Sequence, residues 1–198
     1  EVYLKDISNE SLGKGKKIIW DEVNKRAKKK IINTFERDRL MAKGYTQKDL
    51  SGFEHMDFVI EAVFEDIKLK HKVIAEIEAK VPAHCVIATN TSAIPIAEVA
   101  AKSKRPENIV GMHYFSPVNK MPLLEVIRHK GNTDEVVSRA VQMGLDQGKT
   151  VIVVSDSPGF YTTRVLASLM DESVLLLQEG VEIGRLETLM KNFGWPVG

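Results

Sequence analysis

Short apolar runs alternate with helical patterns between residues 57 and 155, and this alternation limits the possible folds more than any other feature. The runs are apolar at almost every position rather than at every second one, which is typical of strands buried on both faces. They comprise residues 57–64, 84–89, 109–113, 123–127 and 150–154. The pattern predicts a doubly wound, mainly parallel α/β sheet with helices on both faces.

The segments around these runs give the remaining elements. Leu69, Val73 and Ile77 share one face of a helix expected over residues 66–80, and Thr133 is a suitable N-cap for a helix that continues to about residue 147. A short helix is expected over 94–101. Further predictions are a strand at 2–4, helical structure over 9–32, a short helix after Thr34 and a loop over 43–53.

The pattern changes after residue 156, because no further strand is predicted there. Helices are expected over 160–178 and 183–193. We therefore predict two domains, an α/β domain over residues 1–156 and the beginning of an all-α domain over 157–198. The chain opens on Glu1 within an extended pattern and ends in a loop pattern, so we expect it to be part of a longer protein.

Composition excludes several classes of protein. The 198 residues are 43% hydrophobic and 28% charged, which excludes a disordered tail or a disulfide scaffold. A net charge of +1 gives no overall attraction to nucleic acid or to an anionic membrane. Cys85 is the only cysteine, so an internal disulfide is impossible. No apolar run has the roughly 20 residues of a membrane span, and the histidines lack metal-type spacing.

Asp6 follows the first predicted strand, where dinucleotide-binding sheets place an acid that binds the adenosine ribose. The Gly-rich loop that precedes such an acid is absent. Gly13 and Gly15 imitate only half of it, and the segment around Gly148 lacks the first glycine of a P-loop. Asp6 is therefore either a ribose ligand or an ordinary acid at a strand end.

The segment GMHYFSPVNKMPLLEVI (111–127) carries the most chemistry. His113 ends one strand, and Glu125 lies inside the next apolar run, where a charged side chain needs a partner. A carboxylate beside an imidazole fixes its tautomer and stabilises its cation. The two residues form either a catalytic dyad or a structural ion pair, and the pattern favours neither.

Other polar residues lie at predicted strand ends. Asn90 and Ser92 follow the run 84–89, where they would either line a ligand site or cap the next helix. Glu61 and Glu65 would be solvated or would face a cofactor. The basic stretch 14–30 is interpreted as a solvated helix face in preference to a phosphate-binding patch.

Four segments in order resemble one family closely. They are DFVIEAVFEDIKLK (57–70), NTSAIPI (90–96), residues 111–127 and SPGFYTTR (157–164). Together they resemble the NAD-dependent L-3-hydroxyacyl-CoA dehydrogenases of fatty acid β-oxidation. The likeness is nearest to the dehydrogenase region of the multifunctional enzymes, which also carry an enoyl-CoA hydratase domain. It implies NAD as cofactor and an acyl-CoA as substrate.

The resemblance also implies roles in cofactor binding. The acid at the position of Asp6 binds the NAD ribose, and Glu65 lies near the nicotinamide side. Asn90 belongs to the same edge of the sheet.

For catalysis the resemblance makes His113 the base and Glu125 its partner. Ser92 would bind the 3-hydroxyl of the substrate and Lys29 the CoA phosphates. Ser116 and Thr163 stand where the single-function enzymes have asparagine. We expect both to contact substrate.

Departures from the family limit what this chain does alone. The family's first strand, its Gly-rich loop and most of its helical dimerisation domain are absent, so we expect the isolated chain to be inactive and to bind NAD weakly. The parent is expected to form a homodimer or a complex with hydratase and thiolase activities. Its location would be mitochondrial, in the matrix or at the inner membrane, in a eukaryote and cytoplasmic in a bacterium.

Two other functions stay open at this point. A non-catalytic scaffold between hydratase and thiolase units would need none of the site residues. A short-chain 3-hydroxybutyryl-CoA dehydrogenase would need all of them.

Overall fold

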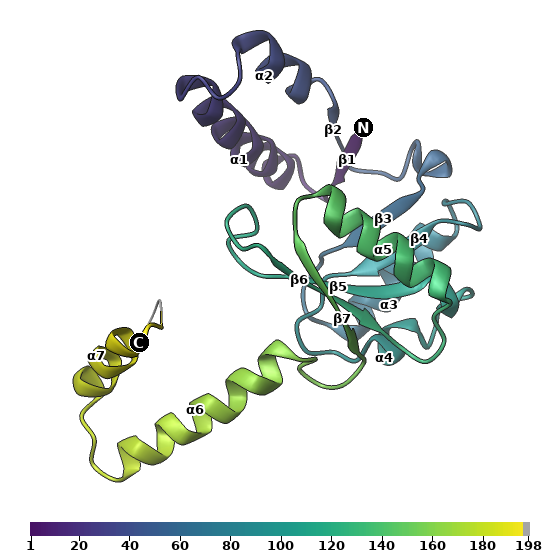
Figure 1. The fold of residues 1–198 in the computed structure, drawn as a ribbon. Coiled ribbons are helices and arrows are strands. Elements are labelled where there is room, and N and C mark those ends of the chain that lie inside the picture. Colours follow the sequence, from purple (N-terminus) through teal and green to yellow (C-terminus); the bar gives the residue numbers. More distant parts are fainter. Residues whose placement is uncertain (196–198) are drawn as a thin grey trace. The chain divides into compact units, whose positions relative to one another are not determined.

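A computed structural model describes residues 1–195 (Figure 1). The chain forms two compact units, residues 1–55 and the remainder from Met56. Each is described by itself. Residues 196–198, the end of the predicted helical domain, lie outside the described part.

The N-terminal unit contains a two-stranded parallel sheet and two helices. Strand β1 (Val2–Lys5) pairs with β2 (Gly44–Gln47), and helices α1 (Asn9–Lys28) and α2 (Thr34–Met41) connect them. The Ser8 side chain caps α1 by accepting a hydrogen bond from the Ser11 amide, and a capping box begins α2. The predicted strand and helices are confirmed. The prediction of a loop over 43–53 is wrong for residues 44–47. This short polar segment forms strand β2 by pairing with β1.

The second unit contains a five-stranded sheet in the order β3-β4-β5-β6-β7. Neighbouring strands are parallel except β5 and β6, which are antiparallel. The strands are β3 (Phe58–Glu61), β4 (Val86–Thr89), β5 (Ile109–Tyr114), β6 (Leu123–Arg128) and β7 (Thr150–Ser155). This sheet confirms the predicted doubly wound, mainly parallel fold. Among residues 1–195, β1 and β2 pair only with each other and form a sheet of their own.

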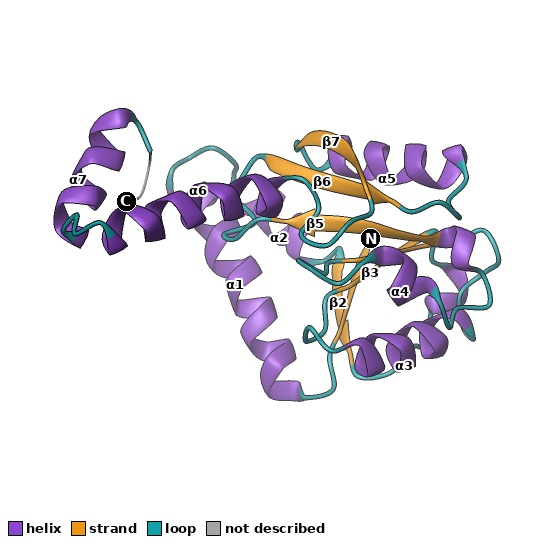
Figure 2. Ribbon diagram, turned by 90° about the horizontal axis from the view of Figure 1, so that it is seen from below, coloured by secondary structure: helices purple, strands orange, loops and turns teal. Residues whose placement is uncertain are grey.

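Helices cover both faces of the larger sheet (Figure 2). Helix α5 (Asp134–Asp146) lies on one face, with Val136, Val137 and Ala140 packed on buried strand residues such as Met112 and Val126. Helices α3 (Ile67–Glu78) and α4 (Ile96–Ala100) lie on the other. Short 3₁₀ helices occupy Phe53–His55 and Pro106–Asn108. Burial of both faces explains why the strands are apolar throughout.

Two helices follow the sheet, α6 (Thr162–Gln178) and α7 (Ile183–Phe193), as predicted. Gly180 lies between them with a φ of +92°, a conformation that glycine adopts without strain. Among the residues described, no helix has the length and apolar character needed to cross a bilayer.

Gly111 allows β5 to pack closely on its neighbours two residues before His113. A Cβ atom there would lie 2.7 Å from Ile96 Cδ1 in α4 and 2.8 Å from Ile127 Cβ in β6. Only glycine, which has no Cβ atom, fits at this distance, so the close packing of β5 requires glycine at position 111.

We expect Gly111→Ala to lower the free energy of unfolding by about 1–3 kcal/mol, because the added methyl overpacks the contact with α4 and β6. Gly184→Ala is the control, since within the described residues no heavy atom outside the neighbouring helix backbone lies within 4 Å of the methyl it would add. Urea denaturation followed by circular dichroism measures both. Equal stability of Gly111→Ala and wild type would contradict the close packing.

Candidate active site

Polar side chains gather at one edge of the larger sheet. Strand β4 ends at Thr89 and is followed directly by Asn90 and Ser92, while His113 lies next to the end of the parallel neighbour β5. The carboxyl ends of parallel strands form the usual ligand-binding edge of such sheets. The fold therefore brings together the residues that the sequence placed at separate strand ends.

His113 and Glu125 form a direct pair across β5 and β6. They stand opposite each other in the antiparallel register, and His113 Nδ1 lies 2.7 Å from Glu125 Oε2. The Glu125 side chain is fully buried, and that of His113 is 10% exposed. A carboxylate only accepts hydrogen bonds, so Nδ1 carries a proton, and in the neutral imidazole Nε2 keeps a lone pair. This is the tautomer that a general base requires.

Two aromatic rings lie next to the imidazole. The Phe115 ring centroid lies 4.5 Å from that of His113, and the Phe160 centroid lies 5.9 Å away. Phe160 is buried and has a φ of +49°, which is uncommon for a residue other than glycine. These rings limit access of water to the base.

Three further donors reach Glu125. The amides of Tyr161 and Thr162 donate to Oε1 over 3.1 and 2.9 Å, and the Thr162 hydroxyl donates to Oε2 over 2.9 Å. Thr163, which was predicted to contact substrate, is exposed in the first turn of α6, whereas Thr162 was not predicted to belong to the site. The signal available was a hydroxyl residue at the start of a predicted helix.

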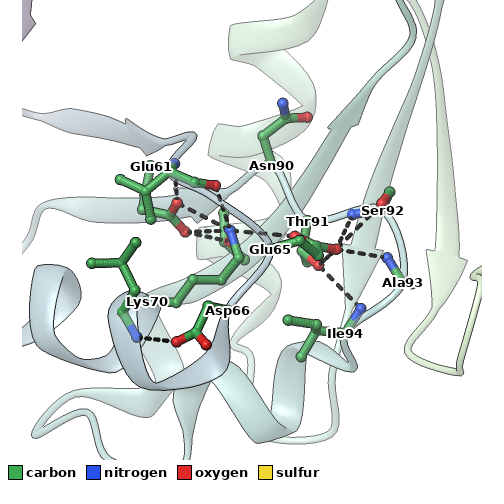
Figure 3. A network of polar contacts seen from close by, with 12 residues as sticks. Glu61, Glu65, Asp66, Lys70, Asn90, Thr91, Ser92, Ala93 and Ile94 are labelled. Carbon is green, nitrogen blue, oxygen red and sulfur yellow. Dashed lines mark hydrogen bonds and ion pairs between the residues drawn. The ribbon is translucent and has the colours of Figure 1, made fainter. Parts of the chain in front are cut away.

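Glu65 organises the turn that follows β4 (Figure 3). Its Oε1 accepts hydrogen bonds from the Thr91 hydroxyl at 2.6 Å, the Ser92 amide at 2.9 Å, the Ser92 hydroxyl at 3.2 Å and the Ala93 amide at 3.2 Å. Burial by itself would raise the pKa of Glu65, but these hydrogen bonds and the charge of Lys70 together lower it. The ionised carboxylate therefore fixes the position of Ser92.

A buried ion pair lies next to Glu65. Lys70 Nζ is 3.1 Å from Glu61 Oε1 and 3.6 Å from Glu65 Oε2, and neither Lys70 nor the Glu61 side chain is exposed. Glu61 also accepts hydrogen bonds from the Thr89 hydroxyl at 2.7 Å and the Val63 amide at 2.6 Å. Of the two alternatives for Glu61, solvation at the strand end is wrong, because the buried ammonium of Lys70 replaces water as its partner.

Lys70 was missed because Leu69, Val73 and Ile77 were the residues predicted to share one apolar face of helix α3. The structure buries Lys70, Ile74 and Ile77, at helical positions i, i+4 and i+7, while Leu69 and Val73 are half-buried. The available signal was a lysine on the same helical face as two isoleucines, nine residues after an acid in an apolar strand.

The remaining predicted residues of this unit have definite places. Asn90 Oδ1 accepts a hydrogen bond from the Tyr114 amide at 2.9 Å and so joins the ends of β4 and β5. Ser116 is exposed in the segment between β5 and β6.

Asp6 and Lys29 belong to the N-terminal unit. Asp6 follows β1, is half-buried and accepts a hydrogen bond from the Ser8 amide at 3.3 Å. Lys29 is exposed at the C-cap of α1. A pocket in this unit is lined by Asn9, Lys16, Gln47 and Lys48, among others.

Two other kinds of chemistry find little support in the described residues. Burial raises the pKa of the fully buried Cys85 thiol to about 11, so it is no thiolate nucleophile at neutral pH. Residues 1–195 contain no group of three or more His, Cys, Asp or Glu side chains arranged to hold a metal ion.

The comparisons with known proteins decide the family. The model of the 3-hydroxyacyl-CoA dehydrogenase NAD binding domain matches residues 1–157, and that of the C-terminal domain matches residues 159–198. The chain belongs to the 3-hydroxyacyl-CoA dehydrogenase family. The family's N-terminal domain binds NAD, so NAD is the cofactor indicated for this chain.

Solved structures agree with this assignment. The (S)-3-hydroxybutyryl-CoA dehydrogenase from Ralstonia eutropha is 30% identical with a TM-score of 0.94, and the match covers 100% of this chain and 71% of that one. The 3-hydroxybutyryl-CoA dehydrogenase from Escherichia coli is 29% identical with a TM-score of 0.93, over 99% of this chain and 42% of that one.

A third structure concerns the multifunctional enzymes. The dehydrogenase part of multifunctional enzyme 1 from C. elegans is 22% identical with a TM-score of 0.65, and the match covers 100% of this chain and 51% of that one. At this identity the comparison shows a shared fold.

We expect Lys70→Met to destabilise the protein by about 3–5 kcal/mol, because it leaves the Glu61 carboxylate buried without its cation. The double variant Glu61→Leu/Lys70→Met should regain most of this loss. Lys72→Met, at an exposed position of the same helix, is the control and should change stability by less than about 0.5 kcal/mol. Urea denaturation measures all three, and a Lys70→Met variant as stable as the control would rule out the buried pair.

The lowered pKa of Glu65 implies a stabilisation that depends on pH. A carboxyl whose pKa is lower in the folded state contributes stability above its unfolded pKa of about 4.3. That contribution is lost as the pH falls through the folded pKa. The stability difference between wild type and Glu65→Gln should therefore be largest near neutral pH and disappear in acid. Denaturation at pH 7 and pH 3 measures it, with the exposed Glu76→Gln as control; a difference independent of pH would contradict this role.

Proposed function

We propose that the protein containing this chain oxidises an L-3-hydroxyacyl-CoA to the 3-ketoacyl-CoA with NAD, in fatty acid β-oxidation. One observation carries the proposal. The buried Glu125 carboxylate holds His113 Nδ1 at 2.7 Å and leaves Nε2 as a base at the ligand-binding edge of the sheet.

In this mechanism His113 Nε2 accepts the proton of the substrate's 3-hydroxyl as hydride leaves C3. Bound NAD supplies the hydride acceptor. Glu125 stabilises the imidazolium that forms, since its negative charge is buried and directly hydrogen-bonded to Nδ1. Phe115 and Phe160 keep water from competing for the base.

Ser92 would bind the oxygen of the substrate's 3-hydroxyl. Its amide and hydroxyl are both held by Glu65, so the hydroxyl has a defined position before the substrate arrives. On substrate binding the single hydroxyl proton of Ser92 would turn from Glu65 to the substrate oxygen, while the Ser92 amide keeps the residue in place. Preorganisation of this kind lowers the cost of orienting the reacting group. Ser116 and Thr163 are proposed as further substrate contacts and Lys29 as a contact for the CoA phosphates.

The residues present suit NAD. Asp6 offers a half-buried carboxylate at the end of β1, and an acid at this place can accept hydrogen bonds from ribose hydroxyls. In the same unit, Lys16 and Lys48 line a pocket with positive charge. Glu65 and Asn90 are proposed to contact the nicotinamide side from the edge of the larger sheet.

A short-chain activity is the second candidate. The relatives from Ralstonia eutropha and Escherichia coli are named 3-hydroxybutyryl-CoA dehydrogenases, which favours a four-carbon acyl group. The ratio of kcat/KM for acetoacetyl-CoA and for 3-ketohexadecanoyl-CoA separates the two. A ratio well above one supports the short-chain activity, and a ratio below one supports long-chain oxidation.

We also propose that the parent protein assembles through its helices, as a homodimer or in a complex with hydratase and thiolase activities. Large apolar side chains of α6 and α7 are exposed in this chain, among them Val165, Met170, Leu175, Ile183 and Leu189. Exposed apolar faces of this kind mark interaction surfaces. The base and its buried partner disfavour a purely structural scaffold, which needs neither.

We expect His113→Ala to lower the turnover number by about 10²–10⁴-fold with little change in NADH affinity, since it removes the base and leaves the remaining contacts. His84→Ala is the matched control, because His84 is exposed and bonds Asp57 just before the strands β4 and β3 begin, at the edge of the sheet opposite to the site. Oxidation of NADH dependent on acetoacetyl-CoA, measured with the full protein, gives both rates. Near-normal turnover of His113→Ala, or inactivity of the wild type, would overturn the proposed function.

A further inference from the structure

The start of helix α6 encloses the carboxylate of the proposed dyad. Glu125 is fully buried in β6, yet three of the four hydrogen-bond donors that it has among residues 1–195 belong to Tyr161 and Thr162, which lie 36 and 37 residues later. The fourth donor is His113 Nδ1. All four bonds satisfy an ionised carboxylate, and a protonated carboxyl would have to give one of them up.

The two carboxylate oxygens have different partners. Oε1 accepts the Tyr161 and Thr162 amides, which point out of the first turn of the helix, where the helix dipole favours negative charge. Oε2 accepts both His113 Nδ1 at 2.7 Å and the Thr162 hydroxyl at 2.9 Å. Thr162 is therefore the one side chain besides His113 that, within the described residues, bonds the oxygen holding the imidazole.

This arrangement limits rotation of the carboxylate. Both oxygens turn together about the terminal bond of the side chain, so the amides on Oε1 and the hydroxyl on Oε2 restrain the same rotation. The Thr162 hydroxyl adds the second point of attachment, and it lies on the oxygen that sets the direction of the Nδ1 hydrogen bond. A hydrogen bond to a charged group is stronger and more directional than one between neutral groups.

We infer that Thr162 is a positioning residue for the reaction: its hydroxyl fixes Glu125 so that the carboxylate holds His113 in the tautomer with the proton on Nδ1. The expected effect of Thr162 on kcat rests on the proposed function. Its expected effect on Glu125 and on the tautomer of His113 rests on the geometry alone. Thr162 touches no reacting atom, and its effect reaches the base through Glu125.

The inference also separates two neighbouring threonines. Thr162 is half-buried with its hydroxyl on Glu125, whereas Thr163 is exposed. Thr163 is proposed to act on the substrate, so losing it should change KM. Losing Thr162 should change kcat.

The test compares Thr162→Val, which removes the hydroxyl at nearly constant volume, with Thr162→Ser, which keeps it. Thr188→Val is the matched control, since its exposed hydroxyl donates to the Gly184 carbonyl within its own helix α7. We expect Thr162→Val to lower kcat by about 10–100-fold, the value of a hydrogen bond to a charged group, while KM for NADH and for acetoacetyl-CoA stays within about twofold. Thr162→Ser and the control should keep kcat within about threefold of wild type.

A second readout does not depend on activity. Long-range ¹H–¹⁵N NMR spectra of the histidine-labelled full protein report which imidazole nitrogen of His113 carries the proton. Wild type and Thr162→Ser should show a single form protonated on Nδ1, and Thr162→Val should show a second tautomer or a broadened Nδ1 proton. If valine prevents folding, judged by circular dichroism, Thr162→Ala removes the same hydroxyl without a branched side chain.

The outcomes separate this inference from the proposed function. An inactive wild type contradicts the proposed function, while the NMR comparison still decides the role of Thr162. An active wild type with unchanged kcat and an unchanged His113 spectrum in Thr162→Val overturns the positioning role and leaves the dehydrogenase activity standing. A fall in kcat that Thr162→Ser fails to restore also contradicts it.

Discussion

The 2.7 Å hydrogen bond between His113 and Glu125 is the interaction on which the proposed site depends, and the one antiparallel pairing of the larger sheet makes it possible. Because β5 and β6 run in opposite directions, two residues from different strands face each other directly. A shift of one residue in this register would turn Glu125 to the opposite face and leave a buried charge without its partner. Gly111 allows β5 to lie close to β6 and α4 in the register that places His113 opposite Glu125. The close packing and the hydrogen bond therefore favour the same register.

The edge of the sheet uses hydrogen-bonded acids in two places for the same purpose. Glu125 orients a base, and Glu65 orients the turn that carries Ser92 and lies next to the Lys70–Glu61 ion pair. At the fully buried Glu125, hydrogen-bond donors replace the water that the carboxylate loses on burial. Side chains held in this way need little rearrangement when a substrate binds, and preorganisation of this kind accounts for much of enzymatic rate acceleration.

The sequence was sufficient for the larger sheet, its helices and the pairing of His113 with Glu125, because apolar runs and a charged residue inside one of them are local signals. It was insufficient for β2, whose polar segment forms a strand only through β1. Glu61 and Lys70 were misjudged for a related reason: each alone is an ordinary surface residue, and only the packing of α3 on the sheet makes them a buried pair. Thr162 was missed because its partner lies 37 residues away.

The most direct test of the account is a single-turnover measurement that separates binding from chemistry. The full protein, preloaded with NADH, is mixed with acetoacetyl-CoA, and the loss of NADH absorbance is followed in wild type and in Glu125→Gln. The account predicts that both bind NADH and acetoacetyl-CoA alike and that the hydride-transfer phase is much slower in the variant. Equal hydride-transfer rates in the two proteins would show that the buried carboxylate is structural, and the account of the base would be wrong.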